Sequence, residues 1–259
     1  MRQKFIGVFL STLAIIACAS PAAGTDWQKP MRLTQDLPVR EELNRKFQFT
    51  RFGHVEVSGV AGDVSIETQN GNTVDVYVVR SAETQTELDC YQTVIENTPD
   101  SLTIRHEQQE QGRCNNIRFR QRVLLRVPRA VDVSLKTIGG AVDVGRIDGV
   151  LRLKGIAGHA TVAQVREARI EGLAQGLTMS IAQPTARGIH VSGVVGQVDL
   201  DLSRDLNADL SVSGLINVDD KTPGVTMTKV NVTSGTTRFG AGGPPISISG
   251  IVGSVRINP

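Results

Sequence analysis

The sequence is poor in aromatic residues, has few cysteines and carries almost no net charge. Phe, Trp and Tyr make up 4% of the chain, so a buried core has to be filled mainly by aliphatic side chains. Setting aside Arg2 and Lys4 with the N-terminal segment lowers the 28 basic residues to 26, equal to the 26 acidic residues. A neutral chain has no global electrostatic attraction to nucleic acid, and we expect no such partner.

The N-terminal segment 1–24 has the pattern of an export signal. Arg2 and Lys4 form a basic start, an apolar run follows to Ala17, and small residues complete the segment. The run is shorter than the roughly 20 apolar residues that a membrane-spanning helix needs. We therefore expect an exported bacterial protein, located in the periplasm, at the outer membrane or at the cell surface.

The three cysteines have two expected roles. Cys18 ends the stretch Ile15–Cys18, which resembles a bacterial lipoprotein box, so lipidation of Cys18 is the alternative to ordinary signal cleavage. Cys90 and Cys114 stay in the mature chain, where an oxidising compartment favours a disulfide between them. No CxxC spacing or histidine cluster accompanies them, which argues against a metal site. Two reduced cysteines are the remaining alternative.

The mature chain divides into a polar lead and a β-rich body. Residues 25–46 are expected to form a linker or strap, with a short helix over Arg40–Phe47. Residues 47–129 alternate apolar and polar positions between Gly, Asn and Asp, which predicts an N-terminal β-rich region with hairpins. Residues 130–259 form a third region, which is repetitive.

Three local signals lie within residues 47–129. The Asn-Gly pair in Gln69–Asn72 favours the positive φ angles of a tight hairpin turn. Ala82–Asp89 is the one plausible helix of this region. Gln92–Glu107 has the pattern of two strands joined by a turn, and a bridge between Cys90 and Cys114 would clamp the open end of that hairpin.

A short phrase recurs along the chain: GVAGDVSI, GIAGHATV, GVVGQVDL and GIVGSVRI. Its second glycine extends to a series with intervals of 18 to 21 residues by subtraction: Gly140, Gly158, Gly176, Gly196, Gly214, Gly235 and Gly253. A steady period of about 19 residues, with room for two short strands in each interval, indicates a solenoid in which each repeat stacks on the last. We predict an all-β fold, a C-terminal parallel β-solenoid of the β-helix type with an N-terminal β-rich capping region; a β-sandwich is the rival.

The alternation within the repeats assigns an inward and an outward set. The inward set is expected to be Val142, Val144, Leu151, Leu153, Ala160, Val162, Ile170, Leu177, Met179, Ile189, Val191, Val198, Leu200, Leu210 and Val212. The outward set is expected to be Asp143, Arg152, His159, Arg169, His190, Asp199 and Asp201. At the C-terminus, Val255–Pro259 is expected either to cap the stack or to pair with another chain.

The chain resembles the bacterial putative-adhesin family, a domain of unknown function with glycine-punctuated β-strand repeats. The resemblance is carried by Val55–Glu83, Leu124–Gly149, Val191–Leu202 and Ile246–Asn258, and it covers most of Phe47–Asn258. It implies an exported, envelope-associated β-solenoid with no established catalysis. Two features depart from the family pattern: the Cys90 and Cys114 pair, and a missing corner glycine near Glu167.

One candidate binding surface comes from a basic run. Arg118, Arg120 and Arg122 alternate with less polar residues, so period two places them on one face of a strand. This face is expected to be a solvated surface, with binding of an anionic glycan or lipid headgroup as the alternative.

Candidates for metal binding and catalysis are weaker. The four histidines are scattered among the strands, and the Gly-Gly-x-Gly-x-Asp turn of calcium-binding β-rolls does not occur in frame. Asp199 and Asp201 lie two apart on one strand, which is suggestive of the paired carboxylates of glycoside hydrolysis, but GxSxG, HExxH and Walker motifs are missing. We therefore expect no enzyme, no cofactor and no metal.

The sequence thus predicts a non-catalytic cell-envelope protein, an adhesin-like binding and scaffolding module. Its partner would be an envelope protein or a glycan, with membrane contact only through a lipidated Cys18. The alternatives are a polysaccharide-acting β-helix enzyme and a lipidated envelope-homeostasis factor.

Overall fold

The computed structural model describes residues 37–50, 52–108, 114, 117–219, 228–231 and 234–258. These residues form an all-β fold with one short helix, which confirms the all-β part of the predicted fold class. The expected signal segment, Cys18 and most of the expected linker lie outside the described residues. The division between the two β-rich regions at residues 129 and 130 stays a prediction.

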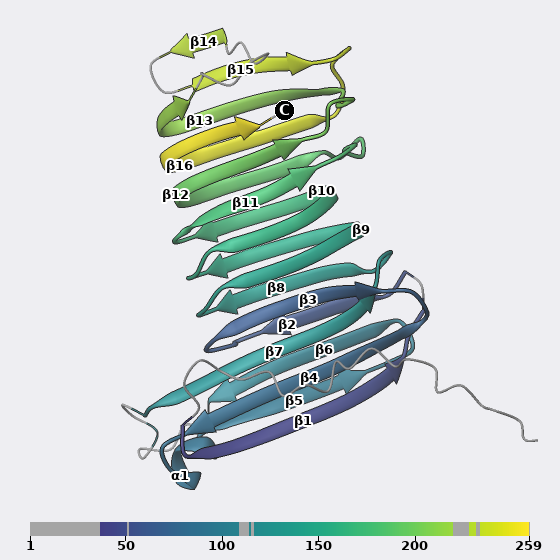
Figure 1. The fold of residues 1–259 in the computed structure, drawn as a ribbon, viewed down its shortest axis with the longest axis vertical. Helices are drawn as coiled ribbons and strands as arrows, with labels where there is room; N and C mark the ends of the chain where they lie inside the picture. The colour runs from purple at the N-terminus through teal and green to yellow at the C-terminus, as the bar shows by residue number, and fades with distance from the viewer. Residues whose placement is uncertain are drawn as a thin grey trace, which may run out of the picture. The chain divides into compact units, whose positions relative to one another are not determined.

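The strands belong to one hydrogen-bonded sheet system (Figure 1). The elements of the first half are β1 (Val39–Gln48), β2 (His54–Ser58), β3 (Asp63–Gln69), β4 (Thr73–Ala82), α1 (Gln85–Leu88), β5 (Tyr91–Asn97), β6 (Ser101–Gln108) and β7 (Phe119–Pro128). Those of the second half are β8 (Asp132–Ile138), β9 (Val142–Ile156), β10 (Ala160–Leu173), β11 (Gly176–Ile181), β12 (Ile189–Leu202), β13 (Ala208–Asp219), β14 (Thr228–Asn231), β15 (Ser234–Phe239) and β16 (Pro245–Asn258).

Long strands take part in two lines of pairing, which we call the first and second stacks. The first stack joins β2, β8, the C-terminal halves of β9 and β10, and the N-terminal halves of β12, β16 and β13. The second stack joins β7, β3, the N-terminal halves of β9 and β10, β11, and the C-terminal halves of β12, β16 and β13. All of these pairings are parallel, and we call each paired segment a rung.

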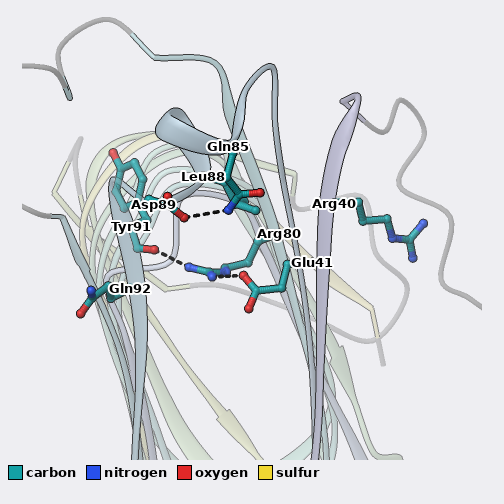
Figure 2. A pocket seen from close by; sticks show the side chains of 8 residues that line it. All are labelled: Arg40, Glu41, Arg80, Gln85, Leu88, Asp89, Tyr91 and Gln92. Atoms are coloured by element: carbon teal, nitrogen blue, oxygen red, sulfur yellow. Dashed lines mark hydrogen bonds and ion pairs between the residues drawn. The ribbon is translucent and has the colours of Figure 1, made fainter.

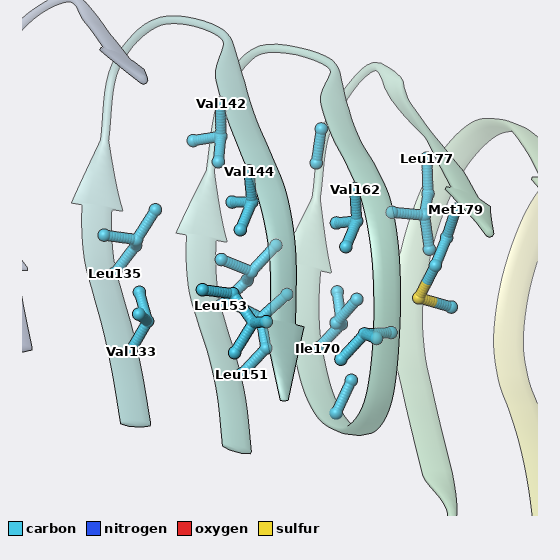
Figure 3. Close-up of a cluster of buried hydrophobic side chains, with 14 of the residues drawn as sticks. Val133, Leu135, Val142, Val144, Leu151, Leu153, Val162, Ile170, Leu177 and Met179 are labelled. Carbon is cyan, nitrogen blue, oxygen red and sulfur yellow. The ribbon is translucent and has the colours of Figure 1, made fainter. Parts of the chain in front are cut away.

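The core lies between the two stacks. Every residue of the predicted inward set is buried, which confirms the alternation from Val142 to Val212. Figure 3 shows side chains from both stacks, such as Leu135 and Val144, packed together in this interior. A fully buried Val, Leu or Ile contributes roughly 1.5 to 3 kcal/mol, and here that burial is supplied by the rungs above and below.

Two columns of corner residues let the chain pass from the first stack to the second, inside β12 and β16 and in the connections that follow β9 and β10. In the first column, Gly155, Gly172, Gly193 and Gly250 have φ between 62° and 70°, a region that side chains with a Cβ disfavour. Thr137, with φ of 55°, occupies the corresponding place beside Gly155. In the second column the backbones approach closely, because a Cβ on Gly158 would lie 2.4 Å from the carbonyl oxygen of Gly140.

The rungs do not follow chain order at the C-terminal end, which corrects two expectations. The closing strand β16 lies between β12 and β13 (Figure 1), so Val255–Asn258 neither caps the stack nor forms its edge. Gly235 does not mark another parallel rung, because it lies in β15, which pairs antiparallel to β13 and β14. Gly253 instead pairs with Gly196 of β12.

The missing corner glycine near Glu167 coincides with an irregularity in pairing. Arg146 and Ile147 of β9 pair with Gln164 and Val165 of β10, but the register then shifts before Glu167. The shift lets β10 pass the corner with one residue fewer than β9, which uses Gly149 there. A Cβ on Gly149 would lie 2.3 Å from the carbonyl oxygen of Val131.

The N-terminal β-rich region corrects two local expectations. Arg40–Phe47 is not helical, because it belongs to β1, which pairs antiparallel with β4. Gln69–Asn72 joins β3 to β4, but these strands are not a hairpin, since β7 lies between them.

Three other local expectations for this region are confirmed. α1 forms within Ala82–Asp89, with a capping box between Thr84 and Glu87. β5 and β6 form the expected antiparallel hairpin. A disulfide joins Cys90 to Cys114, linking the start of this hairpin to the chain beyond it.

We predict that Gly158→Ala destabilises the protein by about 1 to 3 kcal/mol, because its methyl group would collide with the backbone of Gly140. Gly139→Ala is the matched control at the same corner, since its nearest neighbour would be 3.5 Å away. Urea denaturation measures both free energies of unfolding. Equal values for the two variants would show that close corner packing is not required.

Candidate functional site

The outer surface of the first stack carries an ordered line of polar side chains, which we call the central column. Strand register places Arg152 of β9 beside Arg169 of β10, and Arg169 beside His190 of β12. The column continues to Ser247 of β16 and Ser211 of β13. All five are exposed or half-buried at the outward positions that alternation requires, and Arg152, Arg169 and His190 belong to the predicted outward set.

A pocket of about 320 Å³ lies over the basic end of the central column. It is lined by Val150, Arg152, Glu167, Ala168, Arg169, Arg187, Gly188 and His190. Arg152 Nη1 lies 3.6 Å from Asp132 Oδ2, and Arg187 Nη1 lies 3.4 Å from Glu167 Oε1. Arg169 makes no ion pair or hydrogen bond with any other described residue. Positive charge therefore exceeds negative charge in this pocket.

The loop between β11 and β12 forms one wall of the pocket. The backbone N–H of Thr185 donates to the carbonyl oxygen of Arg166 (2.9 Å), and the N–H of Gly188 donates to that of Thr185 (2.8 Å). The Thr185 hydroxyl donates to Glu167 Oε2 (2.9 Å), which orients the carboxylate toward Arg187. His190 Nε2 lies 2.9 Å from the carbonyl oxygen of Arg187. The loop thus holds Arg187 next to the column.

Two of the three arginines that were predicted to share one strand face form ion pairs with acidic residues. Arg118 Nη1 lies 2.9 Å from Glu83 Oε1, and Arg122 Nη2 lies 3.4 Å from Asp63 Oδ2. Arg120 is exposed, and the alternating Gln121 is buried. The structure therefore does not bring these three arginines together with the central column, and anion binding by them stays a prediction.

A second pocket of about 400 Å³ lies beside α1 (Figure 2). Its centre is Arg80, whose guanidinium donates to Glu41 Oε2 and to the carbonyl oxygen of Tyr91. Gln85 Nε2 donates to Asp89 Oδ1 at 2.8 Å. Figure 2 shows Arg40 pointing away from this group. The polar groups at the centre satisfy one another and tie β4, β1 and β5 together.

A buried polar cluster lies near Arg80 in the same region. His106 is buried, and its ring nitrogens contact Thr93 Oγ1 (Nδ1, 3.1 Å) and the side-chain amide of Gln121 (Nε2, 3.2 Å). Burial lowers the pKa of His106 to about 4, with a further contribution from the positive charge of Arg80. The imidazole is therefore neutral at physiological pH. Two buried oxygens, Ser81 Oγ and Gln121 Oε1, have no partner among the described residues.

The histidines do not converge. His159 Nε2 lies 3.0 Å from Thr178 Oγ1 on the second stack, whereas His190 belongs to the first, and His54 lies beside Glu56. Within the described part of the chain, no group of three or more His, Cys, Asp or Glu residues could hold a metal ion. No helix in that part is both long and apolar enough to cross a membrane.

The candidate carboxylate pair on β12 is engaged in surface contacts. Both oxygens of Asp199 accept from Gln197 Nε2, at 2.7 and 2.9 Å, and Asp199 lies 3.9 Å from Arg256 Nη1. Asp201 accepts from Asn258 Nδ2 at 2.9 Å. Neither residue lines the two pockets described above. Asp143 is stacked between Ser65 and Thr161, with no carboxylate in either neighbouring position.

Sequence reasoning identified the outward residues of the pocket but not their association. Arg152 and Arg169 are 17 positions apart, and His190 is 21 positions further on. The alignment of these three residues therefore depends on the lengths of two connections, one from β9 to β10 and one from β10 through β11 to β12. Arg187 lies in a loop and has no periodic signal. The available signal was the alternation, which puts the basic residues Arg152, Arg169 and His190 at outward positions.

We predict that His106 makes stability depend on pH. Its folded-state pKa of about 4 lies below its ordinary value of 6.5, so the unfolded chain binds the proton first as pH falls. The contribution of neutral His106 to the free energy of unfolding is complete above pH 6.5 and declines between pH 6.5 and pH 4. It amounts to at most roughly 3 kcal/mol. His106→Gln should flatten this part of the urea-midpoint profile, while the surface variant His190→Gln keeps it. An unchanged slope in His106→Gln would contradict the assignment.

No protein-family model matches this chain, and no curated protein matches it. Among solved structures, it is similar to a putative cell adhesion protein from Clostridium sporogenes, with 10% identity over 85% of this chain and 99% of that chain and a TM-score of 0.45. It is also similar to a putative adhesin from Bacteroides fragilis (9% identity, 86% and 100% covered, TM-score 0.33). A third is a putative lipid binding protein from Parabacteroides distasonis (14%, 84% and 97%, TM-score 0.26). Two of these three neighbours carry the adhesion name to which the sequence resemblance pointed.

Proposed function

We propose that this protein is an exported, non-catalytic module of the bacterial cell envelope that binds and positions another envelope component. In this proposal the parallel rungs form a β-solenoid that serves as a rigid spacer, and its outward side chains make the contacts. The observation that carries the proposal is the in-register ordering of those side chains. The central column is its clearest case, since five successive rungs contribute one polar residue each.

Rigidity is what makes such a column useful for binding. Its residues stand on strands whose opposite faces are fully buried, as at Leu151, Ile170 and Val191. A side chain whose backbone is already ordered loses less conformational entropy on binding, so a weak contact at each rung can add to a useful affinity. Repeated contacts along one direction suit an extended partner, such as a glycan chain, better than a small molecule.

The alternative of a polysaccharide-acting enzyme has little support among the described residues. Its candidate carboxylates Asp199 and Asp201 are bonded to Gln197 and Asn258. The alternative of a lipidated envelope-homeostasis factor depends on Cys18, which lies outside the described residues. Binding without catalysis is therefore the function that the ordered outer surface supports best.

We predict that the tagged mature protein cosediments saturably with isolated bacterial envelopes and leaves the length of the envelope glycans unchanged. The matched variant Asp199→Asn/Asp201→Asn should be retained to the same extent, because these side chains make only local contacts. Sedimentation measures binding, and size-exclusion chromatography of the glycans measures cleavage. Lack of retention would refute the binding module, and glycan shortening that disappears in the variant would establish the enzyme.

A further inference from the structure

We propose that the basic end of the central column is a binding site for an acidic polysaccharide, a sugar chain that carries carboxylate or phosphate groups. This inference rests on the proposed function and names its ligand class. The anionic groups would lie between Arg152, Arg169 and Arg187, and the sugar hydroxyls would follow the column toward Ser247 and Ser211.

The arginine charge in the pocket is not fully compensated by the described carboxylates. Arg152 and Arg169 are paired in register on neighbouring strands, which stand about 4.8 Å apart. Like charges directly opposite one another destabilise a sheet. The carboxylates nearby are already engaged, because Asp132 pairs with Arg152 and Glu167 with Arg187. Arg169 is left with no partner among the described residues, so an external anion would relieve the repulsion.

The neighbouring column does not supply the missing anion. Lys154 of β9 and Glu171 of β10 are adjacent there, and their charged atoms lie 3.9 Å apart. Glu171 is thus paired with Lys154 and not with Arg169. Guanidinium groups bind carboxylate and phosphate oxygens through paired N–H donors, so two adjacent arginines suit an anionic group of either kind.

The shape of the pocket also suits a ligand. The pocket of about 320 Å³ falls within the roughly 300 to 1,000 Å³ that is usual for ligand sites. Its wall is fixed by the hydrogen bonds of Thr185 to Arg166 and Glu167. A Cβ on Gly188 would lie 2.0 Å from the carbonyl oxygen of Pro245, so the loop packs closely against β16. The backbone that carries Arg187 is therefore held in place before any ligand arrives.

A surface of serine side chains continues from the pocket. Ser247 and Ser211 extend the central column, and Ser192 and Ser249 lie next to each other in the adjacent one. Ser211, Ser247 and Ser249 make no side-chain hydrogen bond with another described residue, so their hydroxyls can donate to and accept from a ligand. A charged pocket followed by hydroxyl groups matches a chain that alternates acid groups and sugar hydroxyls.

The apolar residues favour a glycan over a membrane as the ligand. Among the described residues, the exposed large apolar side chains are Phe52, Val195, Leu215 and Val252. Three of them form their own register line at the corner, Val195 beside Val252 and Val252 beside Leu215, away from the central column. Stable attachment to a lipid surface combines charge with buried apolar area, and the column contains none of these exposed apolar side chains.

The test compares three ligands on the full mature protein by isothermal titration calorimetry. The probes are alginate as a polyuronate, dextran as a neutral glycan, and vesicles of phosphatidylglycerol and phosphatidylcholine. We expect alginate to bind at low salt and to weaken as salt rises, with no binding of dextran. Arg169→Gln should lower alginate affinity about tenfold, and Arg152→Gln/Arg169→Gln further. The control Arg204→Gln removes the same charge at an exposed position outside the column and should change little.

The outcomes separate this inference from the proposed function. Alginate binding that is unaffected by Arg152→Gln/Arg169→Gln, or lost equally in Arg204→Gln, would overturn the assigned site. Binding of the anionic vesicles without alginate would overturn the glycan and indicate a lipid surface. Absence of alginate binding by the wild type would likewise overturn the inference, whereas continued retention on envelopes would leave the binding module standing. Thermal melting of each variant verifies that the fold is intact.

Discussion

The structure depends on one constraint: each rung buries its apolar side chains only when the next rung lies parallel and in register with it. Leu153 is shielded by Leu135 on one side and Ile170 on the other, and this relation repeats along both stacks. The corners follow from it. Because neighbouring backbones are only one strand spacing apart, there is no room for a Cβ at Gly158 or Gly253. The turn that precedes each of these residues needs the left-handed φ angles of Gly155 and Gly250.

The same register organises the outer surface, where function is expected. Because the rungs coincide, outward residues far apart in sequence become neighbours, as Arg152, Arg169 and His190 do. Most charges on this surface are paired across adjacent rungs, such as Lys136 with Glu56. Arg169, which has no such partner in the described part of the chain, therefore stands out, and the loop between β11 and β12 lines the same pocket. The repeat that builds the core thus also aligns the polar groups of a binding surface.

The sequence predicts the local pattern well and the pairing poorly. Alternation depends only on neighbouring residues, which is why the inward positions from Val142 to Val212 were all correct. Choice of partner strand is non-local: the closing phrase near Gly253 and the phrase near Gly196 are nearly alike, and nothing in either indicates that β16 inserts before β13. Arg40–Phe47 has a helix-like composition, but pairing with β4 overrides that preference. The arginines of the pocket become neighbours only through the pairing of the strands, so the site could not be predicted from the sequence either.

Paired cysteines give the most direct test of the register, since adjacent parallel strands bring Cα atoms within the 4.4 to 6.8 Å range of a disulfide. The account predicts that Ser192→Cys/Ser249→Cys cross-links on mild oxidation, because these residues are paired between β12 and β16. Ser192→Cys/Ser213→Cys should stay reduced, because β16 separates β12 from β13. Mass spectrometry of the peptides from each variant shows whether the disulfide has formed. Efficient cross-linking of the second pair without the first would mean that the rungs follow chain order and would contradict the account.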